Sequence, residues 1–254
     1  MEFEIDESLV QGIISDEYAR ARAEIAELGP LRALEQSQQR HDARLAQAAD
    51  AGTLACKAGC FWCCYFTVDV RPVEVVRILE FMETSLPPEE RKRIVGEIVA
   101  SSAAIQTMNE IERMQRTVKC AFLADGRCTI YAARPQTCRN YHATDVAGCE
   151  KSFHEPENED IDPEFAPLVY QSGGAHVDAF SQAMQDAGYD VAVFELNTAL
   201  AAALAQPVTT RRRFEAGESL FADLQGEEVV PEFGPHRRED APPLPEPGEV
   251  ERPE

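Results

Sequence analysis

The stretch Cys56-Lys-Ala-Gly-Cys60-Phe-Trp-Cys63-Cys64 packs four cysteines into a short run of the sequence. The chain has eight cysteines in all, and the other four are Cys120, Cys128, Cys138 and Cys149. Thiolates are soft ligands that suit zinc, copper(I) and iron–sulfur clusters, and four of them can close a tetrahedral shell. The pattern therefore predicts a cysteine metal site in the middle of the chain.

The spacing within the first run fits a metal. Cys60 and Cys63 have the separation of a zinc knuckle, and Gly59 before them allows the backbone a tight turn. If this piece is helical, Cys56 lies one turn before Cys60 on the same face. Because adjacent side chains normally point apart, we expect Cys64 to serve a second site or to remain a free thiol.

A second run, Lys119-Cys120-Ala-Phe-Leu-Ala-Asp-Gly-Arg-Cys128-Thr-Ile-Tyr-Ala-Ala-Arg134-Pro135-Gln-Thr-Cys138-Arg139, follows after a gap. With the first run, it resembles a bacterial cysteine-cluster family described as a zinc- or iron-chelating domain, whose members include flagellin lysine N-methylases. The resemblance covers residues 52–150 and implies a metal-binding role, but no reaction. The family cysteines it matches are Cys56, Cys60, Cys63, Cys64, Cys120, Cys128 and Cys138. Cys149 falls on a more variable position, so we expect it to matter less for metal content than Cys60.

The surroundings of the cysteines suit an anionic thiolate site. Between residues 119 and 141 there are four basic side chains and one acidic side chain, and nearby cations lower the pKa of cysteines. We expect Arg134 to support the site through a hydrogen bond or salt link, with Arg139 beside it. His142 and His154 are alternative ligands, since histidine commonly binds zinc. Aromatic residues gather in the same segments, where an apolar shell would keep water from the metal.

Composition excludes some partners and favours a compartment. The formal net charge of −21, from 24 basic and 45 acidic residues, repels nucleic acid and anionic lipid surfaces. The acidic N-terminus shows no secretory signal, and no run of about 18 apolar residues suggests a membrane span. We therefore expect a cytoplasmic protein without nucleic-acid or membrane partners. In that reducing setting, clustered cysteines are metal ligands more often than disulfides.

Apolar spacing predicts a mainly α fold: a helical domain with irregular cysteine-rich metal-binding loops and at most a short strand. Helices are expected on either side of Gly29-Pro30, from Pro72 onward, from Ser85 to Val118 and over 174–188, 193–204 and 209–224. His41 lies among polar residues and is expected at the surface. The expected organisation is a helical N-terminal arm (1–50), a cysteine domain (51–155), C-terminal helices packing on it (156–225) and a disordered acidic, proline-rich tail (226–254).

Three functions remain open at this level. The leading hypothesis is a cytosolic protein that binds zinc or an iron–sulfur cluster in a structural or redox role. A protein-modifying enzyme of the lysine methylase kind is an alternative, although no glycine loop for S-adenosylmethionine is visible. The third is a metal chaperone or an adaptor that binds a protein through the N-terminal arm or the acidic tail. The motifs of common nucleotide-dependent enzymes and hydrolases are absent.

Overall fold

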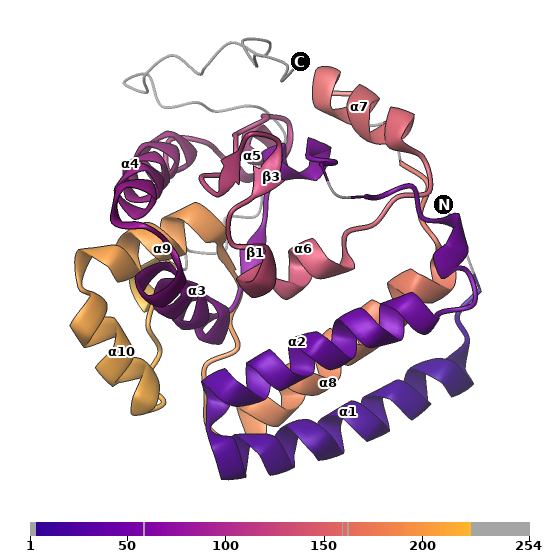
Figure 1. The fold of residues 1–254 in the computed structure, drawn as a ribbon, viewed down its shortest axis with the longest axis horizontal. Coiled ribbons are helices and arrows are strands. Elements are labelled where there is room, and N and C mark those ends of the chain that lie inside the picture. The colour runs from indigo at the N-terminus through magenta and orange to yellow at the C-terminus, as the bar shows by residue number, and fades with distance from the viewer. Residues whose placement is uncertain (1–3, 58, 159, 162, 225–254) are drawn as a thin grey trace.

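Helices dominate the computed structural model, which describes residues 4–57, 59–158, 160–161 and 163–224 (Figure 1). Its α-helices are α1 (Glu7–Leu28), α2 (Pro30–Gln47), α3 (Pro72–Ser85), α4 (Pro88–Ile105), α5 (Glu110–Met114), α6 (Gln136–Asn140), α7 (Val146–His154), α8 (Pro167–Asp186), α9 (Leu196–Ala205) and α10 (Pro207–Glu215). The strands have two residues each: β1 (Asp69–Val70) pairs antiparallel with β4 (Phe194–Glu195), and β2 (Leu123–Ala124) with β3 (Arg127–Cys128). The mainly α prediction is confirmed, and the cysteines lie largely in loops and short turns.

The first two helices pack with α8 into one layer, which runs along the lower side of Figure 1. Gly29 adopts a φ of 81°, a backbone conformation that suits glycine, and Pro30 then begins α2. Apolar side chains of α1 and α2, among them Ile25 and Leu34, meet Phe180 and Met184 of α8 in one buried cluster. The N-terminal segment therefore buries its apolar face within the protein, and protein binding through it stays a prediction.

The same layer encloses a buried polar network. The Glu17 carboxylate accepts hydrogen bonds from Arg40 at 2.7 and 2.8 Å and from the Ser37 hydroxyl at 2.8 Å. Arg44 Nε donates to His176 Nδ1 at 3.2 Å, so His176 Nε2 carries the proton and donates to the Ser37 carbonyl at 3.0 Å. Because its partners fix this imidazole as a donor toward Ser37, the trio of Ser37, His176 and Glu17 is structural and not a nucleophile–base pair.

The surface position predicted for His41 is wrong. Its side chain is fully buried, and its ring meets the His176 ring edge-on at a centroid separation of 5.1 Å. The polar residues around His41 in the sequence indicated a solvent-facing helix. The prediction failed because the polar network described above lies in the interior of this layer. Polar residues of α2 therefore occur on its buried face as well as on its exposed face.

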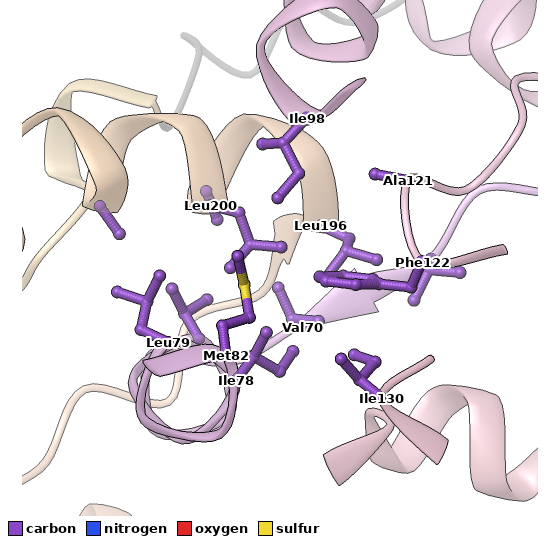
Figure 2. Packing of buried hydrophobic residues seen from close by; sticks show 14 of the residues in the cluster. Val70, Ile78, Leu79, Met82, Ile98, Ala121, Phe122, Ile130, Leu196 and Leu200 are labelled. Carbon is purple, nitrogen blue, oxygen red and sulfur yellow. The ribbon is translucent and has the colours of Figure 1, made fainter. Parts of the chain in front are cut away.

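A second core lies between α3, α4 and α9. Figure 2 shows Met82, Ile98, Phe122 and Leu200 pointing into one cluster, and Val70 joins it from β1. The predicted helix up to Val118 is interrupted, since α4 ends at Ile105 and α5 begins only at Glu110. Asn109 accepts from the Glu112 backbone N–H, and Glu112 accepts from that of Asn109, so a capping box starts a new helix there.

The chain beyond α9 differs from the predicted long final helix. Helix α10 ends at Glu215, and Gly217 with a φ of 69° reverses the chain. Phe221 then packs edge-on against Phe194 at 5.1 Å, which closes the second core. The predicted tail, 226–254, lies outside the described residues. No helix in the described part of the chain is both long enough and apolar enough to span a membrane.

Candidate metal centre

The first cysteine run turns twice in quick succession. Cys60 N–H donates to the Lys57 carbonyl at 3.0 Å, and Gly59 has a φ of 88°. A 3-10 turn, Trp62–Tyr65, follows, in which Cys64 N–H donates to the Phe61 carbonyl at 2.9 Å. The tight turn predicted at Gly59 is thus present, and it brings the cysteines of this run into a small volume.

The second run joins the first through the backbone. Cys120 N–H donates to the Cys64 carbonyl at 2.7 Å, which places these two residues side by side. Asp-Gly is a common hairpin turn pair, and Asp125-Gly126 forms such a turn: both residues have positive φ, 49° and 69°, and they close the β2–β3 hairpin. Cys128 lies on β3, opposite Leu123. The hairpin therefore returns Cys128 toward Cys120.

Helix α6 carries Cys138, and a buried carboxylate fixes the start of that helix. Glu74 Oε1 accepts from the Gln136 N–H at 2.7 Å, and Glu74 Oε2 accepts from the Arg71 N–H at 2.8 Å. One side chain thereby satisfies free N–H groups at the starts of both α3 and α6. Burial raises the pKa of Glu74. Sequence reasoning missed this residue, although an acid three positions after Arg71 at a proline-led helix start is the capping-box signal.

The last cysteine is brought in by aromatic packing. Helix α7 holds Cys149 and also Phe153, whose ring lies 5.2 Å from that of Trp62 and 4.8 Å from that of Tyr65. Apolar side chains of both cysteine runs join this cluster. The expected aromatic cover is therefore present over the turn that carries Cys63 and Cys64.

Cys56 is held from the segment before α7. The Ala143 N–H donates to Cys56 Sγ at 3.3 Å, and Ala55 N–H donates to the Ala143 carbonyl at 2.9 Å. Of the eight cysteines, Cys56 is exposed and Cys149 is buried, whereas the others are partly buried. All eight are free thiols.

The neighbouring thiols of Cys63 and Cys64 influence each other's ionisation. The interaction between these two thiols is the main cause that lowers the pKa of Cys63 to about 7 and raises the pKa of Cys64. That Cys64 serves a second site or remains a free thiol stays a prediction.

Burial opposes ionisation of most other thiols. It raises the pKa of Cys120 to about 12 and that of Cys149 to about 11, and it also raises the pKa of Cys128 and Cys138. A buried thiol stays protonated at neutral pH unless a cation displaces its proton. Metal binding at these residues would therefore release protons.

The fit of a metal rests on the donor chemistry. As the side chains stand, no group of three or more His, Cys, Asp or Glu in the described ranges is arranged to hold a metal ion. The donors gathered here are nevertheless free thiols from separate segments, the type that zinc and iron–sulfur clusters take. The residues thus fit such a group in kind, and the thiols would have to close around it on binding.

Arg139 ties the loop before α6 to two other elements. Its guanidinium donates to the Ala132 carbonyl at 2.6 Å, to the Arg134 carbonyl at 3.1 Å and to the Asp42 carboxylate of α2 at 2.5 Å. The side chain is only 4% exposed. Arg139 therefore fixes the path of the chain beside Cys138. Asp42 helps to hold Arg139 in place, a role that sequence reasoning did not find.

Arg134 supplies positive charge to the thiols. Its guanidinium lies 4.1 Å from the centroid of the Tyr131 ring and 3.7 Å from the Asp42 carboxylate. Its charge favours the ionised forms of Cys63 and Cys128, although burial still raises the pKa of Cys128. This electrostatic contact is the kind of support expected of Arg134, whereas a direct hydrogen bond from it to a thiol stays a prediction.

The two candidate histidines differ in setting. Burial lowers the pKa of His142 to about 4, so this ring is neutral and able to bind a metal, and its Nε2 has no hydrogen-bond partner among the described residues. His154 is half exposed, with its ring 5.9 Å from that of Trp62. Neither is arranged as a ligand together with the cysteines.

Comparison with known protein families gives one match. Residues 55–162 match the CxxCxxCC family model, described as "Putative zinc- or iron-chelating domain". This segment of the chain therefore matches the zinc- or iron-chelating family that the cysteine pattern indicated. Neither the comparison with curated proteins nor that with solved structures gave a match.

Proposed function

We propose that residues 55–162 bind zinc or an iron–sulfur cluster through cysteine thiolates, and that the bound metal has a structural role. The observation that carries the proposal is that eight free thiols lie on four segments that contact one another. These segments are the 56–64 run, the 120–128 hairpin, α6 and α7, and backbone, apolar or aromatic contacts join them. All the donors are sulfur, which is the choice of structural zinc and of iron–sulfur clusters.

A structural role is supported by how little regular structure the cysteine segments have. The described residues of the stretches 51–66 and 118–135 form 3-10 turns and two-residue strands but no α-helix. Structural thiolate sites supply on the order of 10 kcal/mol of apparent binding energy, comparable with the net stability of a domain. A metal would therefore hold together a region that the helices alone constrain only at its edges.

The charge of the surroundings also supports the proposal. A metal bound by four thiolates keeps a net negative charge, and the positive charges of Arg134 and Lys57, which favour ionisation of Cys63 and Cys60 respectively, would offset it. Arg134 is itself held by Asp42 and the Tyr131 ring. The site thus has fixed cations in a chain whose overall charge is −21.

Chelation under reducing, anaerobic conditions tests the structural role. We expect removal of the metal to lower the midpoint of the circular dichroism melt strongly, while the α1, α2 and α8 layer keeps part of the helical signal. The near-ultraviolet and visible spectrum before chelation separates the two metals, because zinc–thiolate is colourless and an iron–sulfur cluster absorbs visible light.

A matched pair of variants serves as control. Cys138→Ser removes a thiol from α6, whereas Thr137→Ser changes its neighbour and keeps the hydroxyl that donates to the Asp69 carbonyl at 2.9 Å. Cys138→Ser should reduce both the metal content and the change in melting midpoint on chelation, and Thr137→Ser should change neither. An unchanged melting midpoint after complete removal of the metal would contradict the structural role.

A further inference from the structure

Helix α10 lies against α3 on the side of the molecule away from α7 (Figure 1). Between the two helices runs a groove of about 360 Å³. Val76 and Leu79 of α3, both buried, line it from one side, and Val208 of α10, which is 83% exposed, lines it from the other. Apolar side chains therefore border an open groove that the proposed metal site does not use.

Three consecutive arginines, Arg211, Arg212 and Arg213, give this face of α10 a positive charge. Arg211 pairs with Glu83 of α3 at 3.8 Å, and Arg213 pairs with Glu218 at 3.0 Å. Arg212 also lines the groove, and its guanidinium has no ion-pair partner among the described residues. The groove thus combines an apolar lining with an unpaired cation.

The size of the groove favours a tethered segment over a separate protein. Nine residues line it, whereas a stable interface between two proteins uses about 20–30 residues on each side. A contact this small is weak between free molecules. A segment of the same chain on a short linker has an effective concentration in the millimolar range, so a weak contact is enough to hold it.

The chain beyond the described residues contains a segment of matching chemistry. The run Glu227-Glu228-Val229-Val230-Pro231 places two acids directly before two valines and a proline. Valine is β-branched and proline restricts φ, so both lose little conformational freedom when an extended segment binds. This run therefore offers apolar side chains to the groove and carboxylates to its cation.

The point at which the described chain ends also favours this run. Leu224 packs against the core cluster that contains Leu79, and Leu79 lines the groove. Val229 follows Leu224 by five residues, and an extended chain spans about 17 Å over that length. The valines are the first large apolar residues after Leu224 in the sequence, and the short linker keeps them in the neighbourhood of α3.

We propose that residues 227–231 of the same chain bind in the groove between α3 and α10. The two valines cover the apolar lining, and the Glu228 carboxylate pairs with Arg212. Glu215 at the end of α10 also lines the groove and repels an acidic segment, so the acids face Arg212 instead. The sequence predicted disorder over all of 226–254, and the proposal departs from that prediction for these residues alone.

Photo-crosslinking of the full-length protein tests the proposal without assuming which segment occupies the groove. The photoreactive residue p-benzoylphenylalanine replaces Val208, and mass spectrometry identifies the peptides joined to it after irradiation. We expect cross-links to residues 225–233 within one molecule, in a yield that does not depend on protein concentration. The same replacement of Ile5, which is 60% exposed and precedes α1, is the control and should give no cross-link to that segment.

A second position guards against the larger side chain at 208 filling the groove itself. Glu83 lines the groove from α3, and its side chain is 56% exposed, so its replacement leaves the core intact. We expect p-benzoylphenylalanine in place of Glu83 to cross-link to the same residues of the tail. Circular dichroism establishes that each variant is folded.

Substitutions then test the two kinds of contact. Val230→Asp should lower the cross-link yield roughly tenfold, because a charge replaces an apolar side chain in the groove. Leu244→Asp, the same kind of change further along the tail, is the matched control and should leave the yield unchanged. Arg212→Glu should lower the yield roughly threefold, and Arg212→Glu combined with Glu228→Arg should restore it, since the charges are exchanged.

The contrary outcomes are equally specific. Cross-links to the tail of a second molecule, in a yield that rises with protein concentration, would overturn the proposal and assign the groove to a dimer. Cross-links only to other parts of the chain, or none from either groove position, would overturn it as well. Equal yields in Val230→Asp and Leu244→Asp would show that the valines do not bind there. The metal-binding proposal does not depend on any of these results.

Discussion

Replacement of Arg139 should destabilise the protein more than replacement of any single charged residue on the surface. Its guanidinium donates to the Ala132 and Arg134 carbonyls and to Asp42, while the side chain is almost fully buried. Arg139→Ala would leave the Ala132 carbonyl without this donor and would break the pair with Asp42. The Arg134 carbonyl would keep a weaker bond from Gln38 Nε2 at 3.3 Å.

The magnitude follows from these contacts. A charged hydrogen bond contributes about 1.5–3 kcal/mol, and breaking a buried ion pair on one side costs roughly 3–5 kcal/mol. The Asp42 side chain is 46% exposed, so water compensates part of that loss. We therefore expect Arg139→Ala to lower the free energy of unfolding by about 3–4 kcal/mol.

Two related variants test the geometric reasoning. Lysine keeps the charge but cannot donate in three directions from a planar fork, so Arg139→Lys should still cost about 2 kcal/mol. Asp42→Asn removes only the half-exposed partner and should cost about 1 kcal/mol. Urea denaturation of the metal-loaded proteins gives the three values. Full stability in Arg139→Lys would refute the reasoning, because charge alone would then suffice.

Two further predictions concern other buried groups. Glu74→Ala leaves the N–H groups of Arg71 and Gln136 without their acceptor and should lower the free energy of unfolding by about 3–5 kcal/mol in urea denaturation. Glu80→Ala, a control on the same helix, should change the free energy of unfolding little. Equal stabilities of the two variants would contradict the capping role of Glu74. Burial lowers the pKa of His176 to about 3, below its ordinary value of 6.5. The unfolded chain therefore takes up the proton first, and the protein loses stability as the pH falls from about 6.5 toward 3. Between about pH 6.5 and 5 this loss amounts to roughly 2 kcal/mol. His176→Gln should remove this part of the pH-dependent loss and His154→Gln should keep it, and identical pH dependence in the two variants would show that His176 is not responsible.

Local signals in the sequence predicted much of this fold. Gly29-Pro30, Pro72 and Asp125-Gly126 each restrict the backbone by their own chemistry, and the structure has the expected break, helix start and hairpin there. The order and spacing of the cysteines likewise identified the metal-chelating family. These features are readable because neighbours in the chain determine them.

Contacts between distant residues account for what the sequence did not reveal. His41 contacts His176, and Glu74 contacts Gln136. These residues lie far apart in the sequence, and the spacing of apolar residues within a helix does not predict such contacts. The placement of α7, which carries Cys149, beside the first cysteine run depends on Phe153 packing against Trp62. The end of α4 is a different case, because the capping box at Asn109 was visible in the sequence and the apolar stripe obscured it.

The most direct test of the central claim is the metal content of the full-length protein after anaerobic purification. Elemental analysis should find zinc or iron in proportion to protein, and Cys120→Ser should contain less, because this variant lacks a thiol beside Cys64. Zinc and iron at no more than trace levels in the wild-type protein, after purification without chelators, would contradict the claim that these cysteines hold a metal.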